Sequence, residues 1–253
     1  MATENMIVIP KNLDVSQLKF GDVQKNKMGG NVVYLQYGNS KRLTIQTPMM
    51  SCPFGVSCYI DEKTGSKKYS LDVSFKGADE DPKIKAFLDK MQELDEFLID
   101  QGAKNSKEWL GKNQKKEVVE ALYRPLVKPS KDPEKYAPTM KFKIMTNNND
   151  EFQVEAFKYG KSRTPFDFSK LQKGAQVQCI LEVGSIWFVN KTQFGVSFRL
   201  VQARVKSPDK ISGYSFVKED SDDEDEEDFE SEEGDNEDVE ELADELESTE
   251  IEE

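Results

Sequence analysis

The chain has 253 residues, with 35 Lys and Arg against 48 Asp and Glu, for a formal net charge of −13. This average hides two unlike parts, because 23 of the 48 acidic residues and none of the 35 basic ones lie between Glu219 and Glu253. Residues 1–218 therefore carry a formal charge of +10 and the tail one of −23. Such asymmetry indicates nucleic acid or another polyionic partner for the body.

The composition also excludes several classes of function. The chain contains no His, which excludes Ser–His and Cys–His nucleophiles and His-ligated zinc. Its three cysteines are too few for a Cys-only zinc site. The small number of cysteines and the lack of an apolar N-terminal signal predict a reducing, intracellular compartment. No apolar run approaches the roughly 18 residues of a membrane span, and no phosphate-binding glycine motif is present. We therefore expect no catalytic residue, no metal, no cofactor and no membrane partner.

The first half of the body reads as a short segment followed by strands. Residues 1–30 form a mixed N-terminal segment with a short apolar start. Strands are then predicted at Val32–Tyr37, Arg42–Thr47, Val56–Ile60 and Lys67–Lys76. The turn residues Gly38–Lys41 predict that the first two form a hairpin.

A helical insertion is predicted at about residues 81–123, where the apolar period changes from two to between three and four. Asp81 suits the N-cap, Pro82 the first helical position and Gly102 the C-terminal stop. Shorter helices are predicted at Lys107–Leu110 and Lys115–Tyr123.

Strands resume at Thr139–Met145, Glu151–Phe157, Gln176–Val189 and Gly195–Val205. Strands interrupted by a helix midway are typical of a small antiparallel barrel, so we predict a mainly β domain resembling an OB-fold over residues 31–206. An α+β open sheet is the alternative. Residues 207–218 are a predicted linker, and residues 219–253 the acidic tail.

Positive charge and aromatic rings, which together hold single-stranded nucleic acid, mix most densely at Phe157–Arg163. Strand alternation places Lys141 and Lys143 on a polar face, with a simply solvated face as the alternative interpretation. The last strand adds further cations, and two more aromatic residues are candidates for base stacking. The predicted DNA-binding set is Phe54, Lys141, Lys143, Phe157, Lys158, Tyr159, Lys161, Arg163, Trp187, Arg199 and Arg204.

The acidic tail has too little apolar surface to offset chain entropy and is predicted to be disordered. As a polyanion it can compete with phosphates for the basic body, so we expect it to mimic DNA until a bound strand displaces it. Ser221 and Ser231 precede acidic residues and suit an acidophilic kinase. A role in solubility alone is the alternative. The predicted partner-binding residues of the tail are Phe229, Val239, Leu242 and Leu246, the last three on one helical face.

The run from Thr47 to Ser57 (TPMMSCPFGVS), followed by Lys68–Phe75, resembles the single-stranded-DNA-binding (ssDNA-binding) proteins of nucleocytoplasmic large DNA viruses. Those proteins are similar to the OB-fold ssDNA-binding proteins of short-tailed phages. The resemblance covers most of residues 30–253 in order of elements. In the phage proteins the tail ends in an aromatic residue, whereas this chain ends in Glu253 with Phe229 as its only tail aromatic, so that contact is not carried over.

The resemblance implies an OB-fold and sequence-tolerant ssDNA binding in replication, recombination or repair. It also implies that the tail recruits replication proteins such as a polymerase and a helicase–primase, and it leaves room for a homodimer. The expected location is the cytoplasm or nucleus of a virus-infected cell, with packaging in the virion left open. A chaperone of histones or other basic proteins, acting through the tail, and an RNA-binding module are the alternative functions.

Overall fold

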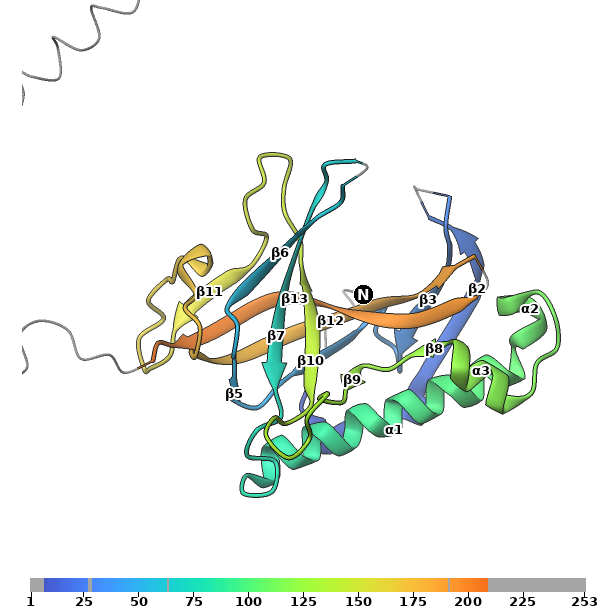
Figure 1. Ribbon diagram of the computed structural model, residues 1–253, viewed down its shortest axis with the longest axis horizontal. Coiled ribbons are helices and arrows are strands. Elements are labelled where there is room, and N and C mark those ends of the chain that lie inside the picture. The colour runs from blue at the N-terminus through green and yellow to red at the C-terminus, as the bar shows by residue number, and fades with distance from the viewer. Residues whose placement is uncertain (1–6, 27–28, 63, 191, 209–253) are drawn as a thin grey trace, which may run out of the picture. The chain divides into compact units, whose positions relative to one another are not determined.

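The computed structural model describes residues 7–26, 29–62, 64–190 and 192–208 (Figure 1). The acidic tail, with all of its predicted partner-binding residues and both serines, lies outside the described residues. The helices are α1 (Pro82–Lys104), α2 (Ser106–Leu110) and α3 (Lys116–Leu122), with short 3-10 turns η1 (Pro10–Asn12), η2 (Val15–Gln17) and η3 (Phe168–Lys170). Among the described residues, no helix combines the length and the apolar composition that crossing a membrane requires.

Strands make up most of the regular secondary structure among the described residues. They are β1 (Ile7–Val8), β2 (Leu18–Lys25), β3 (Asn31–Tyr37), β4 (Leu43–Gln46), β5 (Met50–Ser51), β6 (Val56–Ile60), β7 (Lys67–Ser74), β8 (Tyr123–Arg124), β9 (Val127–Lys128), β10 (Thr139–Ile144), β11 (Glu155–Lys158), β12 (Gln176–Val189) and β13 (Gln193–Lys206).

Five of these strands close into a barrel. In ring order, β5 pairs with β7, β7 with β10, β10 with β13, β13 with β12, and β12 again with β5. The β10–β13 pair is parallel and the other four are antiparallel. Numbered along the chain, the ring order is first, second, third, fifth, fourth, which is the Greek-key closure of an OB-fold barrel. The structure thus confirms the predicted mainly β, OB-like barrel with inserted helices, and the open-sheet alternative is wrong.

The helical insertion lies between β7 and β10. Asp81 caps α1 by accepting a hydrogen bond from the backbone N of Lys83 (2.7 Å), with Pro82 in the first turn, as predicted. The prediction that Gly102 stops the helix is wrong, because α1 continues to Lys104. A Cβ at Gly102 would come within 2.8 Å of Phe194 and 2.9 Å of Val119, so close packing against β13 and α3, rather than helix termination, accounts for this glycine.

Figure 1 shows α1 running along one side of the strands, opposite the side on which the β2–β3 and β6–β7 strand pairs rise. Aromatic rings fill the space on the helical side, with Phe20 of β2 edge-on to Trp109 of α2 (5.5 Å between centroids) and Phe188 stacked on Phe194 (5.9 Å). Buried Asp95 of α1 accepts hydrogen bonds from the Tyr123 hydroxyl (2.6 Å) and from a backbone N–H. Burial raises the pKa of Asp95 to about 6 despite these bonds.

One prediction about strand pairing is wrong. β3 and β4 do not form a hairpin with each other; instead both pair with β12, β3 opposite Ser185–Trp187 and β4 opposite Ile180–Val183. A 14-residue β12 is long enough to carry both strands end to end on one edge. The N-terminal segment also contains strands, since β1 pairs with β4 and β2 with β3. The Gly21-Asp22 interruption, where the β2–β3 register shifts, removes the alternation that would have predicted β2.

Candidate nucleic-acid interface

The outer face of the barrel carries a row of cross-strand neighbours. Lys143 of β10 lies opposite Ser70 of β7 on one side and Arg199 of β13 on the other. Arg199 lies opposite Glu182 of β12, and Glu182 lies opposite Thr44 of β4. Residues directly opposite each other in neighbouring strands share a face of the sheet. Three charged side chains from β10, β13 and β12 therefore stand next to one another on the outside of the barrel.

A depression of about 400 Å³, which we call the groove, lies over this row. In Figure 1 the β2–β3 and β6–β7 hairpins rise on opposite sides of the middle of β12 and β13. The groove is bounded by the first of these hairpins and by the strands β10, β12 and β13. Its lining is Asn26, Val32, Tyr34, Arg42, Lys143, Glu182, Gly184, Ser185, Trp187, Ser197 and Arg199.

Ion pairs organise the charges of the groove. Glu182 accepts hydrogen bonds from both Arg42 (2.7 Å) and Arg199. Burial raises the pKa of the Glu182 carboxyl, but the bonds and charges of the two arginines outweigh this and hold it below its usual value. Desolvation of the Lys143 amine, although the side chain as a whole is exposed, and the charge of Lys68 lower the pKa of Lys143. The groove therefore holds its arginines in place and part of its positive charge is neutralised.

Aromatic rings stand on both sides of this row. Tyr34 on β3 is 49% exposed, and Tyr59 on β6 is 61% exposed. Tyr59 lies opposite Lys68 of β7, whose Nζ is 6.0 Å from the centre of the tyrosine ring. Trp187 is half-buried in the groove, and its indole Nε1 is buried without a hydrogen-bond acceptor among the described residues. Exposed rings of this kind offer flat surfaces to unpaired bases.

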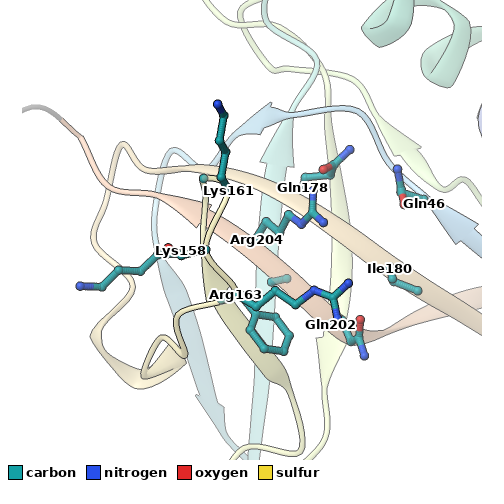
Figure 2. Close-up of a pocket in the computed structure, with 12 residues that line it drawn as sticks. Gln46, Lys158, Lys161, Arg163, Gln178, Ile180, Gln202 and Arg204 are labelled. Atoms are coloured by element: carbon teal, nitrogen blue, oxygen red, sulfur yellow. The ribbon is translucent and has the colours of Figure 1, made fainter.

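A second depression, of about 490 Å³, lies farther along the same two strands, and we call it the basic pocket (Figure 2). Its four cations come from β11, the following loop and β13, and none of them has an ion pair within the described residues. Figure 2 shows Arg163 and Arg204 extending in the same direction across the pocket, whereas the amines of Lys158 and Lys161 point outward. The lining is Gln46, Phe157, Lys158, Gly160, Lys161, Ser162, Arg163, Gln178, Ile180, Gln202, Ala203 and Arg204, with no acidic residue.

Backbone hydrogen bonds fix the loop that carries half of these cations. β11 runs parallel to the end of β13, with Phe157 opposite Arg204. The backbone N of Tyr159 donates to the carbonyl of Val205 (2.8 Å), and that of Lys158 donates to the carbonyl of Thr164 (2.8 Å). The hydrogen bond between Lys158 and Thr164 therefore closes the base of the loop, and Lys161 and Arg163 lie on this short, tethered segment.

The structure places the predicted DNA-binding residues in three groups. The basic pocket contains Phe157, Lys158, Lys161, Arg163 and Arg204, and the groove contains Lys143, Trp187 and Arg199. Three predicted residues line neither depression: exposed Phe54, exposed Tyr159, and Lys141, which forms an ion pair with Asp72 (3.3 Å). Which of them contact DNA stays a prediction. Within the described residues, no group of His, Cys, Asp and Glu side chains could hold a metal ion.

Several residues of this surface were not among those predicted from the sequence. Tyr34 was assigned only to a strand, yet its position between buried Val33 and Leu35 marks it as outward-facing. Tyr59 lies in a run without alternation, which hid its orientation. The three glutamines of the basic pocket carry no charge and no ring, so nothing in the sequence singles them out: they are Gln46, Gln178 and Gln202.

Solved structures of bacteriophage proteins are similar to this chain. The single-stranded DNA-binding protein of bacteriophage Enc34, in complex with ssDNA, is 15% identical, with 76% of this chain and 98% of that chain covered and a TM-score of 0.41. A second structure of the Enc34 single-stranded DNA-binding protein is 17% identical, with 79% of this chain and 96% of that chain covered and a TM-score of 0.41. The protein gp2.5, the single-stranded DNA-binding protein of bacteriophage T7, is 11% identical, with 70% of this chain and 98% of that chain covered and a TM-score of 0.43. A search of curated protein sequences finds no significant match.

The sequence also matches the sequence model of one protein family. The match covers residues 72–219, from β7 through the helical insertion to β13 and beyond, which is more than half of the chain. The resemblance to proteins of large DNA viruses remains a prediction beside it. The chain belongs to this family, which is described as a family of unknown function (DUF5871).

Proposed function

We propose that this protein binds single-stranded DNA, largely without sequence preference, on the outer face of its barrel. The observation that carries the proposal is the arrangement of exposed Tyr34 and Tyr59 on opposite sides of a row of cations that includes Lys68, Lys143 and Arg199. Cations attract the phosphates of any strand, and rings stack on any unpaired base. In a duplex the base faces are already stacked on one another, so the exposed rings favour a single strand.

The finer proposal is that the protein coats and protects exposed single strands during replication, recombination or repair of a viral-type genome. The tail, with 23 acidic residues, would compete with DNA for the basic body and would recruit replication proteins such as a polymerase and a helicase–primase. Charge complementarity between a body of +10 and a tail of −23 supports this division of roles. Assembly as a homodimer belongs to the same proposal.

The charge of the tail also favours a second candidate, a chaperone for histones or other basic proteins. In that case the tail would be the active element and the body a scaffold, so removing the tail would abolish activity. The ssDNA proposal makes the opposite prediction, because a competitor for the basic surface would be removed. An RNA-binding module is the closer alternative, since cations and exposed rings suit either kind of strand.

Tryptophan fluorescence provides a test. Trp187 lines the groove whereas Trp109 is 2% exposed in the aromatic core, so quenching by a bound strand should report mainly on Trp187. The full chain and a variant ending at Lys218 would be titrated with single- and double-stranded DNA of matched sequence, and with the matching RNA, at two salt concentrations. We expect preference for single-stranded DNA, and equal or tighter binding without the tail.

The outcomes separate the candidates. Equal affinity for duplex and single strand would overturn the proposed function. An unchanged affinity and salt slope after truncation at Lys218 would remove the competing role of the tail but leave strand binding in place. Preference for RNA would assign the surface to the RNA-binding alternative.

A further inference from the structure

The basic pocket contains hydrogen-bond acceptors as well as cations, which a site for phosphate alone does not need. Gln178 of β12 and Gln202 of β13 both line it, beside Arg204 and Arg163. Phosphate oxygens only accept hydrogen bonds, so the arginines suffice for them. The amide oxygens therefore indicate a ligand that also carries donors.

The orientation of both amides follows from their partners. Nε2 of Gln178 donates to the backbone carbonyl of Thr47 (3.2 Å), and Nε2 of Gln202 donates to the carboxylate of Glu155 (2.7 Å). A carbonyl and an ionised carboxylate can only accept, so each amide must present its nitrogen to that partner. Figure 2 shows the oxygens of Gln178 and Gln202 on the side of the arginines.

The partner of Gln178 is itself fixed. Thr47 is 2% exposed, and its backbone N–H donates to the carbonyl of Cys179 (2.8 Å). Its hydroxyl donates to the carbonyl of Pro48 (2.8 Å) and accepts from the backbone N of Cys179 (2.9 Å). The amide of Gln178 is therefore held by a rigid part of the β4–β12 junction, which restricts rotation of its oxygen.

The remaining lining suits a flat ligand with an apolar face. Phe157 and Ile180 provide apolar surface within the same pocket. The volume of about 490 Å³ falls within the range of roughly 300–1,000 Å³ that small-ligand sites occupy. A nucleotide combines all of these properties: a phosphate for the arginines, an apolar base face and a base edge with donors.

We propose that the basic pocket takes up one nucleotide of a bound strand and reads its base through the oxygens of Gln178 and Gln202. This inference rests on the proposed strand binding and adds a preference to it. Adenine, cytosine and guanine carry an exocyclic amino group with two N–H donors for such oxygens, whereas thymine and uracil have a carbonyl in place of the amino group of cytosine and only one donor, N3–H. Binding is then sequence-tolerant along most of the strand but favours amino-bearing bases at this position.

Oligodeoxycytidine and oligodeoxyuridine of equal length test the proposal. Their bases differ only in the group at position 4 and in the proton on N3, and a homopolymer places the same base in the pocket in every register. With the full chain and fluorescence anisotropy of labelled oligonucleotides, we expect oligodeoxycytidine to bind roughly 2- to 10-fold more tightly, the range for one net hydrogen bond. The double variant Gln178→Met, Gln202→Met should reduce this ratio to near one, because methionine keeps the length of the side chain and lacks the amide oxygen.

Gln176→Met is the matched control. Gln176 is an exposed glutamine on the same strand and does not line the pocket, so its substitution should leave the ratio unchanged. Thermal melting of each variant checks that folding is intact. A wild-type ratio of one, or a ratio that the double variant retains, overturns the inference while leaving strand binding intact. If neither oligonucleotide binds, the proposed function itself fails.

Discussion

The groove and the basic pocket lie on the same outer face of β12 and β13 but hold their cations differently. In the groove, Glu182 binds both Arg42 and Arg199, and the environment of Lys143 disfavours its charge. In the basic pocket, Arg163 and Arg204 have no ion pair within the described residues. The groove is thus preorganised but partly neutralised, with exposed rings around it, whereas the pocket presents unneutralised charge. We expect base stacking to dominate binding at the groove, and salt-dependent attraction of phosphates to dominate it at the basic pocket.

The largest expected effect is on stacking at the two exposed tyrosine rings on either side of the row of cations. Tyr34→Ala and Tyr59→Ala should each weaken ssDNA binding by about 1–3 kcal/mol, or roughly 5- to 150-fold, with the salt slope unchanged. Fluorescence titration at several salt concentrations measures both quantities. Tyr136→Ala is the control, because Tyr136 is 66% exposed and lies between β9 and β10, outside the strands that carry the row of cations and outside both depressions. A similar loss in the control would show that the effect is not specific to the groove.

Removing the unneutralised arginines should give the next largest effect. In the double variant Arg163→Gln, Arg204→Gln, the slope of log K against log salt should become shallower by about 1.4, that is, 0.7 per phosphate contact. At 0.1 M salt this corresponds to a loss of about 25-fold in affinity. Lys112→Gln with Lys131→Gln changes the net charge equally outside both depressions. If the control variant makes the slope equally shallow, the net charge of the protein, rather than the pocket, accounts for the change.

A smaller change of opposite sign is expected at Glu182. Glu182→Gln removes the negative charge that neutralises Arg42 and Arg199, so ssDNA should bind more tightly, by about 5-fold at 0.1 M salt, and with a steeper salt slope. The arginines of the groove would then carry unneutralised charge, as those of the basic pocket do. Glu120→Gln on α3 is the matched control. Weaker binding by the Glu182 variant would mean that holding the arginines in position matters more than freeing their charge.

The smallest expected effect is a pH dependence at Lys143. The pKa of its amine is lowered, so its charge, and the attraction to phosphate that depends on it, is present at neutral pH and is lost earlier than for an ordinary lysine as the pH rises. Between pH 7 and 10 the wild type should lose about 2-fold more affinity than Lys143→Arg, which stays charged. This range lies above the pKa of about 6 of buried Asp95, so titration of that carboxyl does not interfere. Parallel pH profiles for both proteins would contradict the assignment.

Much of the fold follows from local patterns. The predicted ends of β12 match the structure to the residue, and those of α3 and β10 to within one residue. The reason is that the apolar period and the turn and capping residues that mark such ends are local features of the sequence. The basic pocket was predicted in part, since Phe157, Lys158, Lys161 and Arg163 lie within seven consecutive residues. The groove was not predicted as a unit, because Tyr34, Arg42 and Glu182 are distant in sequence and share no pattern.

By itself, the sequence determined the split between a basic body and an acidic tail, the strand and helix periods, and the cationic loop at Phe157–Arg163. Only the tertiary structure decided that β3 and β4 share one edge of β12, that the barrel closes through the parallel β10–β13 pair, and that Tyr34 lines the same groove as Lys143 and Arg199. The physical reason is that alternation assigns each side chain to a face of its own strand. Which strands become neighbours is decided by the packing of the whole core, and so is the surface that they form.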